Sequence, residues 1–288
     1  MDKISFVIPA YNEGGNIASV IKQLVKFFPE AEILVVDDGS EDNTKSEAVK
    51  AGALVFSHPY RMGNGASVKD GIRYCSHEII VMMDADGQHK PEDAKKLLEH
   101  IGEHNMVVGA RSRESKTVWY RDVANQVYNR LASYMTGFKV EDLTSGFRVF
   151  KKSEVSKYLY LFPNGFSYPT TVTMAYLRSG RSVLYVPVET EYRVGKSKIK
   201  LLQDGTKFLL IIMRIATLYS PLKIFMPASF VCFSLGLFWY LYSYFICNAG
   251  FPKMSLLLFM TSVIIFMQGL LSEQICQMRY DKSEIFSE

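Results

Sequence analysis

Two long uncharged apolar runs near the C-terminus constrain this sequence more than any other feature. They cover residues 224–249 and 254–272, and a helix needs about 20 apolar residues to cross the hydrocarbon core of a bilayer. Apolar side chains occupy every side of both segments rather than one stripe, which disfavours the alternative of a buried helical hairpin in a soluble domain. The sequence therefore predicts two transmembrane helices that return both ends of the tail to one side of a membrane.

The charged residues around these runs predict the orientation of the chain. The chain consists of a polar first part of about 200 residues and an apolar tail. The average composition, 48% hydrophobic with a net charge of +4, does not show this difference, because it averages the two parts. The apolar run at residues 4–10 is too short for a signal peptide, so the first part is expected to stay in the cytoplasm. By the positive-inside rule, the basic residues on both outer flanks predict that these flanks are cytosolic. They are Lys200, Lys207, Arg214, Lys223, Arg279 and Lys282.

The polar part of the chain alternates between two kinds of segment. Runs rich in β-branched residues are separated by amphipathic stretches, and this alternation predicts an α/β fold with a mostly parallel sheet covered by helices on both faces. The expected strands are residues 4–9, 33–36, 53–57, 79–83 and 106–109, and the expected helices are residues 16–28, 42–51, 66–75, 91–101 and 120–136. Such sheets bind ligands at the carboxyl ends of their strands.

Acidic residues follow two of these strands. Residues 37–40 read Asp-Asp-Gly-Ser, and residues 84–88 read Asp-Ala-Asp-Gly-Gln. In an extended segment Asp84, Asp86 and Gln88 point the same way and offer three oxygen ligands to one hard cation, for which Mg²⁺ or Mn²⁺ is suitable. A structural explanation exists for each acidic segment. Asp84 and Asp86 could form a turn followed by the start of a helix, and residues 37–44 could start the next helix. The residues alone leave both alternatives open.

Five motifs, taken in order, resemble those of family 2 glycosyltransferases with the GT-A fold. They lie at residues 7–13, 35–40, 84–89, 142–148 and 193–198. More narrowly, the chain is similar to the polyprenyl-phosphate glycosyltransferases, the group that contains dolichol-phosphate mannose synthase and undecaprenyl-phosphate glucosyltransferases. The resemblance runs from residue 4 to about residue 200 and includes the two spans. It implies a Rossmann-like catalytic domain, interfacial helices and a two-helix membrane anchor.

The resemblance also implies roles for individual residues. It assigns Pro9, Tyr11, Glu13 and Asp38 to the nucleotide of a nucleotide-sugar, which Asp84 also contacts. It makes Asp84, Asp86 and Gln88 a metal site for Mg²⁺ or Mn²⁺ that holds the diphosphate, and it places Asp84 and Asp86 among the catalytic residues. A cation beside the diphosphate suits a leaving group on which negative charge develops.

Basic residues placed by these motifs suggest a pocket for a lipid phosphate. Arginine is favoured there because it binds phosphate through two hydrogen bonds, although a single arginine is more often a surface residue or part of a structural ion pair. Arg111 and Arg121 are expected to take part in catalysis as well. Arg148 is either a phosphate ligand or a structural clamp. The full acceptor set is Arg111, Arg121, Arg148, Arg193 and Lys198.

The expected reaction is a metal-dependent, inverting transfer of a sugar from a UDP- or GDP-linked donor to dolichyl or undecaprenyl phosphate. A phosphate monoester has a second pKa near about 6, so it is already largely a dianionic nucleophile. A general base is then unnecessary, and Asp142, the nearest acid, is left as a loop-ordering residue.

The expected organisation has three parts: a cytoplasmic catalytic domain at residues 1–198, juxtamembrane amphipathic helices at 199–221, and two transmembrane helices with a short tail at 222–288. The expected partners are the donor, the acceptor and the lipid bilayer, with no nucleic acid. A homo-oligomer through the transmembrane helices stays open, because Gly236 and Gly269 allow close helix approach.

Two departures from the family pattern concern the donor and acceptor contacts. Residues 165–171 contain no glutamate where family members commonly have one, and Arg61 stands where asparagine is frequent. Two other functions remain as alternatives: a membrane-tethered transferase with a soluble or glycan acceptor, and a non-catalytic membrane scaffold that retains a transferase fold.

Overall fold

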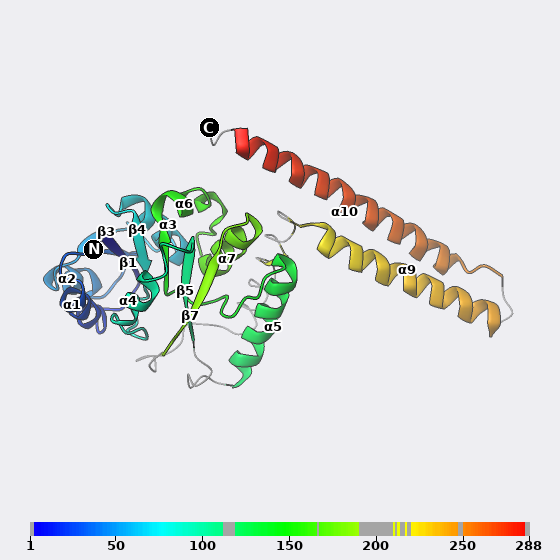
Figure 1. The fold of residues 1–288 in the computed structure, drawn as a ribbon. Coiled ribbons are helices and arrows are strands. Elements are labelled where there is room, and N and C mark those ends of the chain that lie inside the picture. Colours follow the sequence, from blue (N-terminus) through cyan, green and yellow to red (C-terminus); the bar gives the residue numbers. More distant parts are fainter. Residues whose placement is uncertain are drawn as a thin grey trace. The chain divides into compact units, whose positions relative to one another are not determined.

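The computed structural model describes residues 3–111, 119–165, 167–189, 210, 212, 213, 217, 220–246 and 250–285. Within this set, the side chains of residues 119–124 and 279–285 are not described. The chain divides into two compact units, residues 1–211 and 212–288. Figure 1 shows a sheet with its helices in the first unit and a helical hairpin in the second.

Seven strands of the described residues form one sheet in the first unit. Its order is β3-β2-β1-β4-β6-β5-β7, and all neighbouring pairs are parallel except those that involve β6. The strands are β1 (Ile4–Ala10), β2 (Glu32–Asp37), β3 (Leu54–Ser57), β4 (Ile79–Met82), β5 (Met106–Arg111), β6 (Arg148–Lys151) and β7 (Val183–Val188). The expectation of an α/β fold with a mostly parallel sheet is confirmed.

Helices connect the strands and cover both faces of the sheet (Figure 1). They are α1 (Ile17–Phe27), α2 (Thr44–Lys50), α3 (Asn64–Tyr74), α4 (Asp93–Leu98), α5 (Trp119–Thr136), α6 (Lys152–Ser156), the short 3₁₀ helix η1 (Leu159–Leu161) and α7 (Tyr168–Arg178). In α1 the apolar side chains recur at helical spacing, and Ile17, Val20, Ile21 and Leu24 form its buried face.

The central strand β1 shows how the two faces of the core are filled. All seven of its residues are buried, and Phe6 and Ile8 belong to the core that α1 and α4 cover. Val7 points to the opposite face, where α3 packs so closely that a β carbon on Gly71 would lie 2.2 Å from Val7 Cγ1. Because side chains alternate along a strand, this almost wholly apolar strand serves both layers of helices.

Strand β6 is an antiparallel insertion that the sequence analysis did not anticipate. It lies between β4 and β5 and pairs with both: Arg148 lies opposite Met82 on one side and Val108 on the other. Since the strand is only four residues long, its local pattern is weak. Its position places the first residue of β6, Arg148, in the middle of the sheet.

The second unit is an antiparallel hairpin of α9 (Leu222–Phe245) and α10 (Lys253–Ile285). Both helices are long and apolar enough to cross a membrane, and most of their large apolar side chains are exposed within the unit. Ser229 and Ser262 hold the helices together through reciprocal hydrogen bonds, each hydroxyl donating to the other's carbonyl oxygen over 2.9 Å. Gly236 faces Leu258 and Phe259, and Gly269 faces Phe225.

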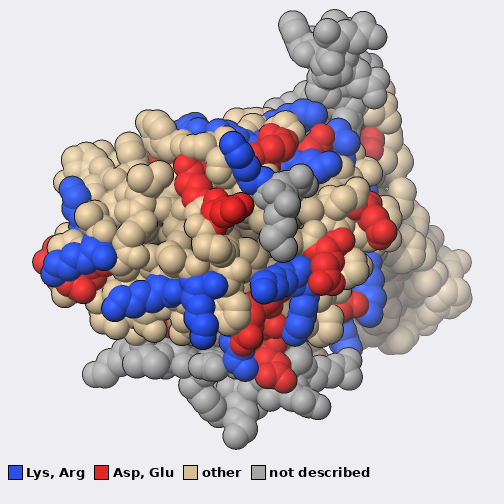
Figure 2. Space-filling model, turned by 60° about the vertical axis from the view of Figure 1, so that its left-hand side comes forward, with Lys and Arg blue, Asp and Glu red and all other residues tan. Residues whose placement is uncertain are grey.

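Charged side chains are interspersed on the surface of the first unit. On the face shown in Figure 2, lysine and arginine side chains alternate with aspartate and glutamate side chains instead of gathering in one basic area. Local ion pairs in the first unit include that of Lys96 with Asp93 at 2.6 Å.

Candidate functional site

The carboxyl ends of β1 and β2 present two loops that hydrogen-bond to each other. The N–H groups of Asn12 and Glu13 donate to the side-chain oxygens of Ser40 and Thr44, each over 2.9 Å. In return, Asn12 Oδ1 accepts the N–H of Glu41 at 2.9 Å. These bonds fix the segment that carries Tyr11 and Glu13, both half-buried, at the edge of the sheet where α/β folds bind ligands.

Two residues expected at the nucleotide are enclosed by the protein. Pro9 is buried within β1, opposite Val36. Asp38 is only 3% exposed. Its Oδ1 accepts the N–H of Met62 at 2.8 Å, and its Oδ2 accepts the N–H of Gly63 at 2.9 Å. Asp38 therefore anchors the loop before α3, and its expected role at the nucleotide stays a prediction.

His58 extends the anchor of this loop. The side chain is buried, and its Nδ1 lies 2.9 Å from Asp38 Oδ1 while its Nε2 lies 3.2 Å from Asp70 Oδ2. The backbone on the other side is equally restricted: Gly39 has a φ of +68°, and a β carbon there would lie 2.6 Å from the carbonyl carbon of Tyr60. Residues 58–63 are thus held both through side chains and through backbone packing.

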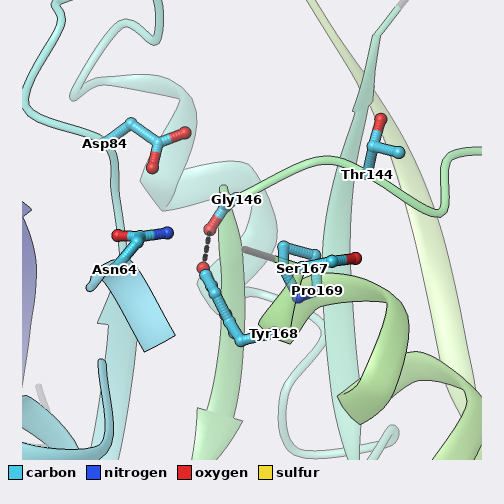
Figure 3. Close-up of a pocket in the computed structure, with 7 residues that line it drawn as sticks. All are labelled: Asn64, Asp84, Thr144, Gly146, Ser167, Tyr168 and Pro169. Carbon is cyan, nitrogen blue, oxygen red and sulfur yellow. Dashed lines mark hydrogen bonds between the residues drawn. The ribbon is translucent and has the colours of Figure 1, made fainter. Parts of the chain in front are cut away.

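The acidic segment after β4 borders a pocket of about 100 Å³. Asp84, Asp86 and Gln88 are all half-buried, and Asp86 Oδ1 accepts the N–H of Gln88 at 3.2 Å. Only Asp84 of the three lines the pocket, where it lies across from Asn64 (Figure 3). The full lining is Asn64, Asp84, Thr144, Gly146, Ser167, Tyr168 and Pro169.

The donor atoms of this segment fit a hard divalent cation. Among the described residues there is no cluster of three His, Cys, Asp or Glu side chains placed to hold a metal. Asp84 and Asp86 supply two carboxylates and Gln88 an amide oxygen, which leaves coordination positions for oxygens of a diphosphate. The side chains are also partly exposed, so a solute can reach them.

Gly146 and Tyr168 shape the floor of the pocket. The Tyr168 hydroxyl donates to the carbonyl oxygen of Gly146 over 2.9 Å (Figure 3), and its side chain is 1% exposed. A β carbon on Gly146 would lie 2.5 Å from Asp84 Oδ2, so only glycine lets the Asp84 carboxylate lie where it does. Tyr168 follows Ser167, which has a φ of +84°, a strained conformation for a residue other than glycine.

The contacts of Arg148 fit the structural clamp of the two alternatives. Its side chain is 0% exposed, which disfavours contact with a lipid phosphate in this conformation. The guanidinium donates to Ser145 O at 3.0 and 2.6 Å, to Pro169 O at 3.1 Å and to Thr173 Oγ1 at 2.9 Å. It thereby joins the 142–147 loop to α7. Burial lowers the pKa of Arg148 below its ordinary value.

Arg111 forms a two-bond ion pair with Asp142. Its Nε and Nη2 lie 2.8 and 3.0 Å from the two carboxylate oxygens, and Nη2 also donates to Thr144 Oγ1. Asp142 is 6% exposed. Burial alone would raise its pKa, but the hydrogen bonds and charge of Arg111 outweigh this effect and lower the pKa. The side chain of Arg111 is 31% exposed, so part of it is accessible to solvent.

His89 lies beside this ion pair in the core. Its ring stacks on Phe147 with centroids 4.9 Å apart. Burial, assisted by the positive charge of Arg111, lowers the pKa of His89 to about 4. The imidazole is consequently neutral at neutral pH and packs as part of the core under the loop.

Three residues of the expected acceptor site have no described side chain. Arg121 lies in the first turn of α5, where only the backbone is described. Arg193 and Lys198 lie outside the described residues. Conversely, sequence reasoning did not assign Asn64, Thr144, Ser167 and Tyr168 to the site. Ser167 and Tyr168 could have been found from the sequence, because residues 165–171 depart from the family pattern and contain hydroxyl side chains instead of a glutamate.

Comparisons with known families identify both parts of the chain. Residues 5–159 match the family "Glycosyl transferase family 2", and residues 220–278 match "GtrB C-terminal hairpin". Polyprenol monophosphomannose synthase of Mycolicibacterium smegmatis is 29% identical over 67% of this chain and 79% of that protein. An uncharacterized protein of Methanocaldococcus jannaschii is 30% identical over 66% of this chain and 82% of its own length.

Solved structures show the same fold. Glucosyl-3-phosphoglycerate synthase from Mycobacterium tuberculosis, in complex with phosphoglyceric acid, aligns with a TM-score of 0.62 at 20% identity, covering 75% of this chain and 80% of that chain. The same enzyme in complex with Mn²⁺ and UDP-glucose aligns with a TM-score of 0.61 at 20% identity, covering 75% and 79%. The resemblance noted from the five motifs is confirmed: the chain belongs to glycosyl transferase family 2 and is a glycosyltransferase with two apolar C-terminal helices.

Proposed function

We propose that this glycosyltransferase transfers a sugar from a UDP- or GDP-linked donor to a polyprenyl phosphate at a membrane surface. The observation that carries the proposal is the combination, in one chain, of a glycosyltransferase pocket bordered by Asp84 with a hairpin whose outer surface is apolar. The similarity to polyprenol monophosphomannose synthase supports the same acceptor class. A polyprenyl phosphate is accessible only at a membrane, which explains why the two parts are joined.

A divalent cation is proposed as the cofactor, with Mg²⁺ and Mn²⁺ as the candidates. Asp84, Asp86 and Gln88 would hold it, and the Mn²⁺ and UDP-glucose of a structure with the same fold support the assignment. Bound there, the cation would neutralise negative charge on the nucleoside diphosphate that leaves. The chain's own part is to keep the Asp84 carboxylate in place between Asn64 and Gly146.

The nucleophile is proposed to be a phosphate oxygen of the acceptor, which attacks the anomeric carbon with inversion. A phosphate monoester is largely dianionic at neutral pH, so no protein base has to remove a proton. The geometry supports this, because Asp142 is buried, ionised and bonded at both oxygens to Arg111. Catalysis would then depend on positioning and on charge neutralisation.

The proposed acceptor site consists of Arg111, Arg121, Arg193 and Lys198, without Arg148. Arg111 contributes a guanidinium that Asp142 already orients and that belongs to a side chain 31% exposed to solvent. Such a group can hydrogen-bond phosphate oxygens while Asp142 keeps it fixed. Arg121 opens α5, and the other two residues precede the hairpin in the sequence.

The proposed arrangement in the membrane follows the expected three parts of the chain. Residues 1–198 would form the catalytic domain, and α9 and α10 within residues 222–288 would cross the bilayer; most of the expected juxtamembrane segment, residues 199–221, lies outside the described residues. At about 1.5 Å per residue, the 24 residues of α9 are about 36 Å long, enough for a hydrocarbon core of about 30 Å. By the positive-inside rule, the basic flanks support a catalytic domain on the cytoplasmic face.

The proposal is tested by incubating the purified chain in detergent with labelled UDP- and GDP-sugars, a polyprenyl phosphate and Mg²⁺ or Mn²⁺. One donor should give a labelled product that extracts into organic solvent, and a chelator should abolish it. Asp84→Asn and Asp86→Asn should each lower the rate by at least about 100-fold. Transfer at wild-type rates in the presence of chelator would contradict the metal site. Absence of lipid product from every donor, with nucleotide binding retained, would contradict the proposed acceptor.

A further inference from the structure

Arg61 is an exposed cation that the fold holds over the ring of Tyr11. The guanidinium carbon lies 4.4 Å from the ring centroid, within the range of a cation–π interaction. The two residues are fifty positions apart in the sequence. Tyr11 follows β1, and Arg61 lies in the loop between β3 and α3, so both are at the carboxyl edge of the sheet.

The loop that carries Arg61 is anchored independently of the Arg61 side chain. The buried Asp38 carboxylate accepts the N–H groups of Met62 and Gly63. The Tyr60 carbonyl carbon packs on Gly39, where no β carbon would fit. Arg61 is therefore presented by a backbone that is fixed on both sides, and replacing its side chain leaves this anchor in place.

Among the described residues, no acid forms an ion pair with Arg61. Three other described arginines of the first unit do form ion pairs: Arg73 with Asp70, Arg111 with Asp142 and Arg181 with Glu154. No carboxylate of the described residues lies within salt-bridge distance of Arg61. Because the ring of Tyr11 occupies one face of the guanidinium, its N–H groups remain available along the edge. This is the arrangement with which arginine binds phosphate groups.

The same loop runs from the Tyr11 ring to the pocket of Asp84. Asn64, three residues after Arg61, lines that pocket, and β1 lies next to β4 in the sheet. In the proposed function the diphosphate lies at the cation beside Asp84, so a nucleotide whose nucleoside lies toward Tyr11 would have its phosphates on the path between the two. Arg61 is the one arginine or lysine of the loop between β3 and α3.

We infer that Arg61 is a further donor-binding residue, which pairs with a phosphate of the nucleotide while its face rests on Tyr11. The inference rests on the proposed function, since it takes a nucleoside diphosphate as the leaving group. It assigns a role to a residue that departs from the usual asparagine. It also gives Asp38 an indirect role, because Asp38 fixes the loop and Arg61 makes the contact.

Calorimetric titration of the full chain in detergent with Mg²⁺ and UDP or GDP tests this inference. For the nucleotide that the wild type binds, Arg61→Ala should raise the Kd of the diphosphate by about 10-fold or more. The same variant should change the Kd of the matching nucleoside by less than about 3-fold, because no phosphate charge is involved. Arg61→Lys should recover part of the loss. Arg130→Ala, which removes an exposed arginine from α5, is the matched control and should bind like the wild type.

The results separate this inference from the proposed function. An unchanged diphosphate Kd in Arg61→Ala, with a binding-competent wild type, would overturn the role of Arg61 alone. An equal loss for nucleoside and diphosphate would also overturn it, because the contact would not be to phosphate. A wild type that binds neither UDP nor GDP would overturn both. In the transfer assay, Arg61→Ala should raise the KM of the donor and leave the KM of the lipid acceptor unchanged.

Discussion

The carboxylate of Asp84 lies against the α carbon of Gly146, so closely that a β carbon on Gly146 would be 2.5 Å from Asp84 Oδ2 and 2.9 Å from Oδ1. Asp84 follows β4, whereas Gly146 belongs to the loop before β6, the inserted antiparallel strand. Pairing of β6 with β4 thus brings a glycine from a distant part of the sequence under the acid. Because Gly146 has no side chain, the carboxylate of Asp84, a proposed metal ligand, can occupy this position.

Gly146→Ala should therefore displace the Asp84 carboxylate. We expect the transfer rate to fall by about 10- to 100-fold and the Mn²⁺ concentration for half-maximal activity to rise, as when the support of a metal ligand is removed. Gly102→Ala is the matched control, because a β carbon at Gly102 meets nothing within 4 Å. Wild-type activity and metal dependence in Gly146→Ala would show that the position of Asp84 does not matter to the reaction.

Two tyrosines on α7, Tyr168 and Tyr176, allow a test of the hydrogen bond in the pocket floor against a matched control. Tyr168 donates to Gly146 O, so Tyr168→Phe leaves a buried carbonyl unpaired and should lower the free energy of unfolding by about 1–3 kcal/mol. It should also reduce transfer through the displaced loop. The buried Tyr176 hydroxyl has no hydrogen-bond partner among the described residues, so Tyr176→Phe should be neutral or stabilising. Chemical unfolding in detergent and the transfer rate compare the two variants; equal effects would contradict the assigned hydrogen bond.

The ion pair between Arg111 and Asp142 should make the free energy of unfolding depend on pH in the acidic range. The pKa of Asp142 is lowered in the folded state. The stabilisation that its ionised carboxylate gives is therefore complete above the unfolded-state pKa of about 3.9, and it is lost as the pH falls through the folded-state pKa. Asp142→Asn should cost about 3 kcal/mol at pH 7. The difference from the wild type should shrink below about pH 4. Urea unfolding of both proteins between pH 3 and pH 7 measures it, and a difference that does not vary with pH would contradict the ion pair.

Alanine substitutions at the two hairpin glycines, Gly236 and Gly269, should destabilise the hairpin to different degrees. A β carbon on Gly269 would lie 2.7 Å from Phe225 Cβ, whereas one on Gly236 would lie 3.1 Å from Leu258 Cβ. Gly269→Ala should therefore lower the thermal unfolding temperature of the hairpin in detergent more than Gly236→Ala. Both glycines serve contacts between α9 and α10 of one chain. The reverse order of the two variants would contradict this packing.

The sequence was sufficient for the parts of the fold that depend on local patterns. The strand predicted at residues 106–109 is β5, and the helix predicted at 16–28 contains α1, because each has several apolar residues at a regular period. Strand β6 was missed because its four residues become a strand only through pairing with β4 and β5. Helix α7 was missed because its apolar and hydroxyl residues are almost all buried, so it lacks a polar face.

The candidate site was predictable only to the level of its motifs. The acidic segment at residues 84–88 was identified from the sequence, but the contact of Asp84 with Gly146 depends on strand order. Arg148 was left open between two roles because sequence does not show burial, and its buried position in the centre of the sheet favours the clamp. The stacking of Arg61 on Tyr11 joins two loops and has no local signal.

The requirement for a lipid phosphate is the central claim, and a direct comparison of acceptors tests it. The full chain in detergent, with its preferred labelled donor and Mg²⁺ or Mn²⁺, is given a polyprenyl phosphate, the same polyprenol without phosphate, or a soluble phosphate such as phosphoglycerate. We predict labelled product with the polyprenyl phosphate alone, with inverted configuration at the anomeric carbon. Equal transfer to the soluble acceptor, or transfer to the alcohol at the same rate, would contradict the account.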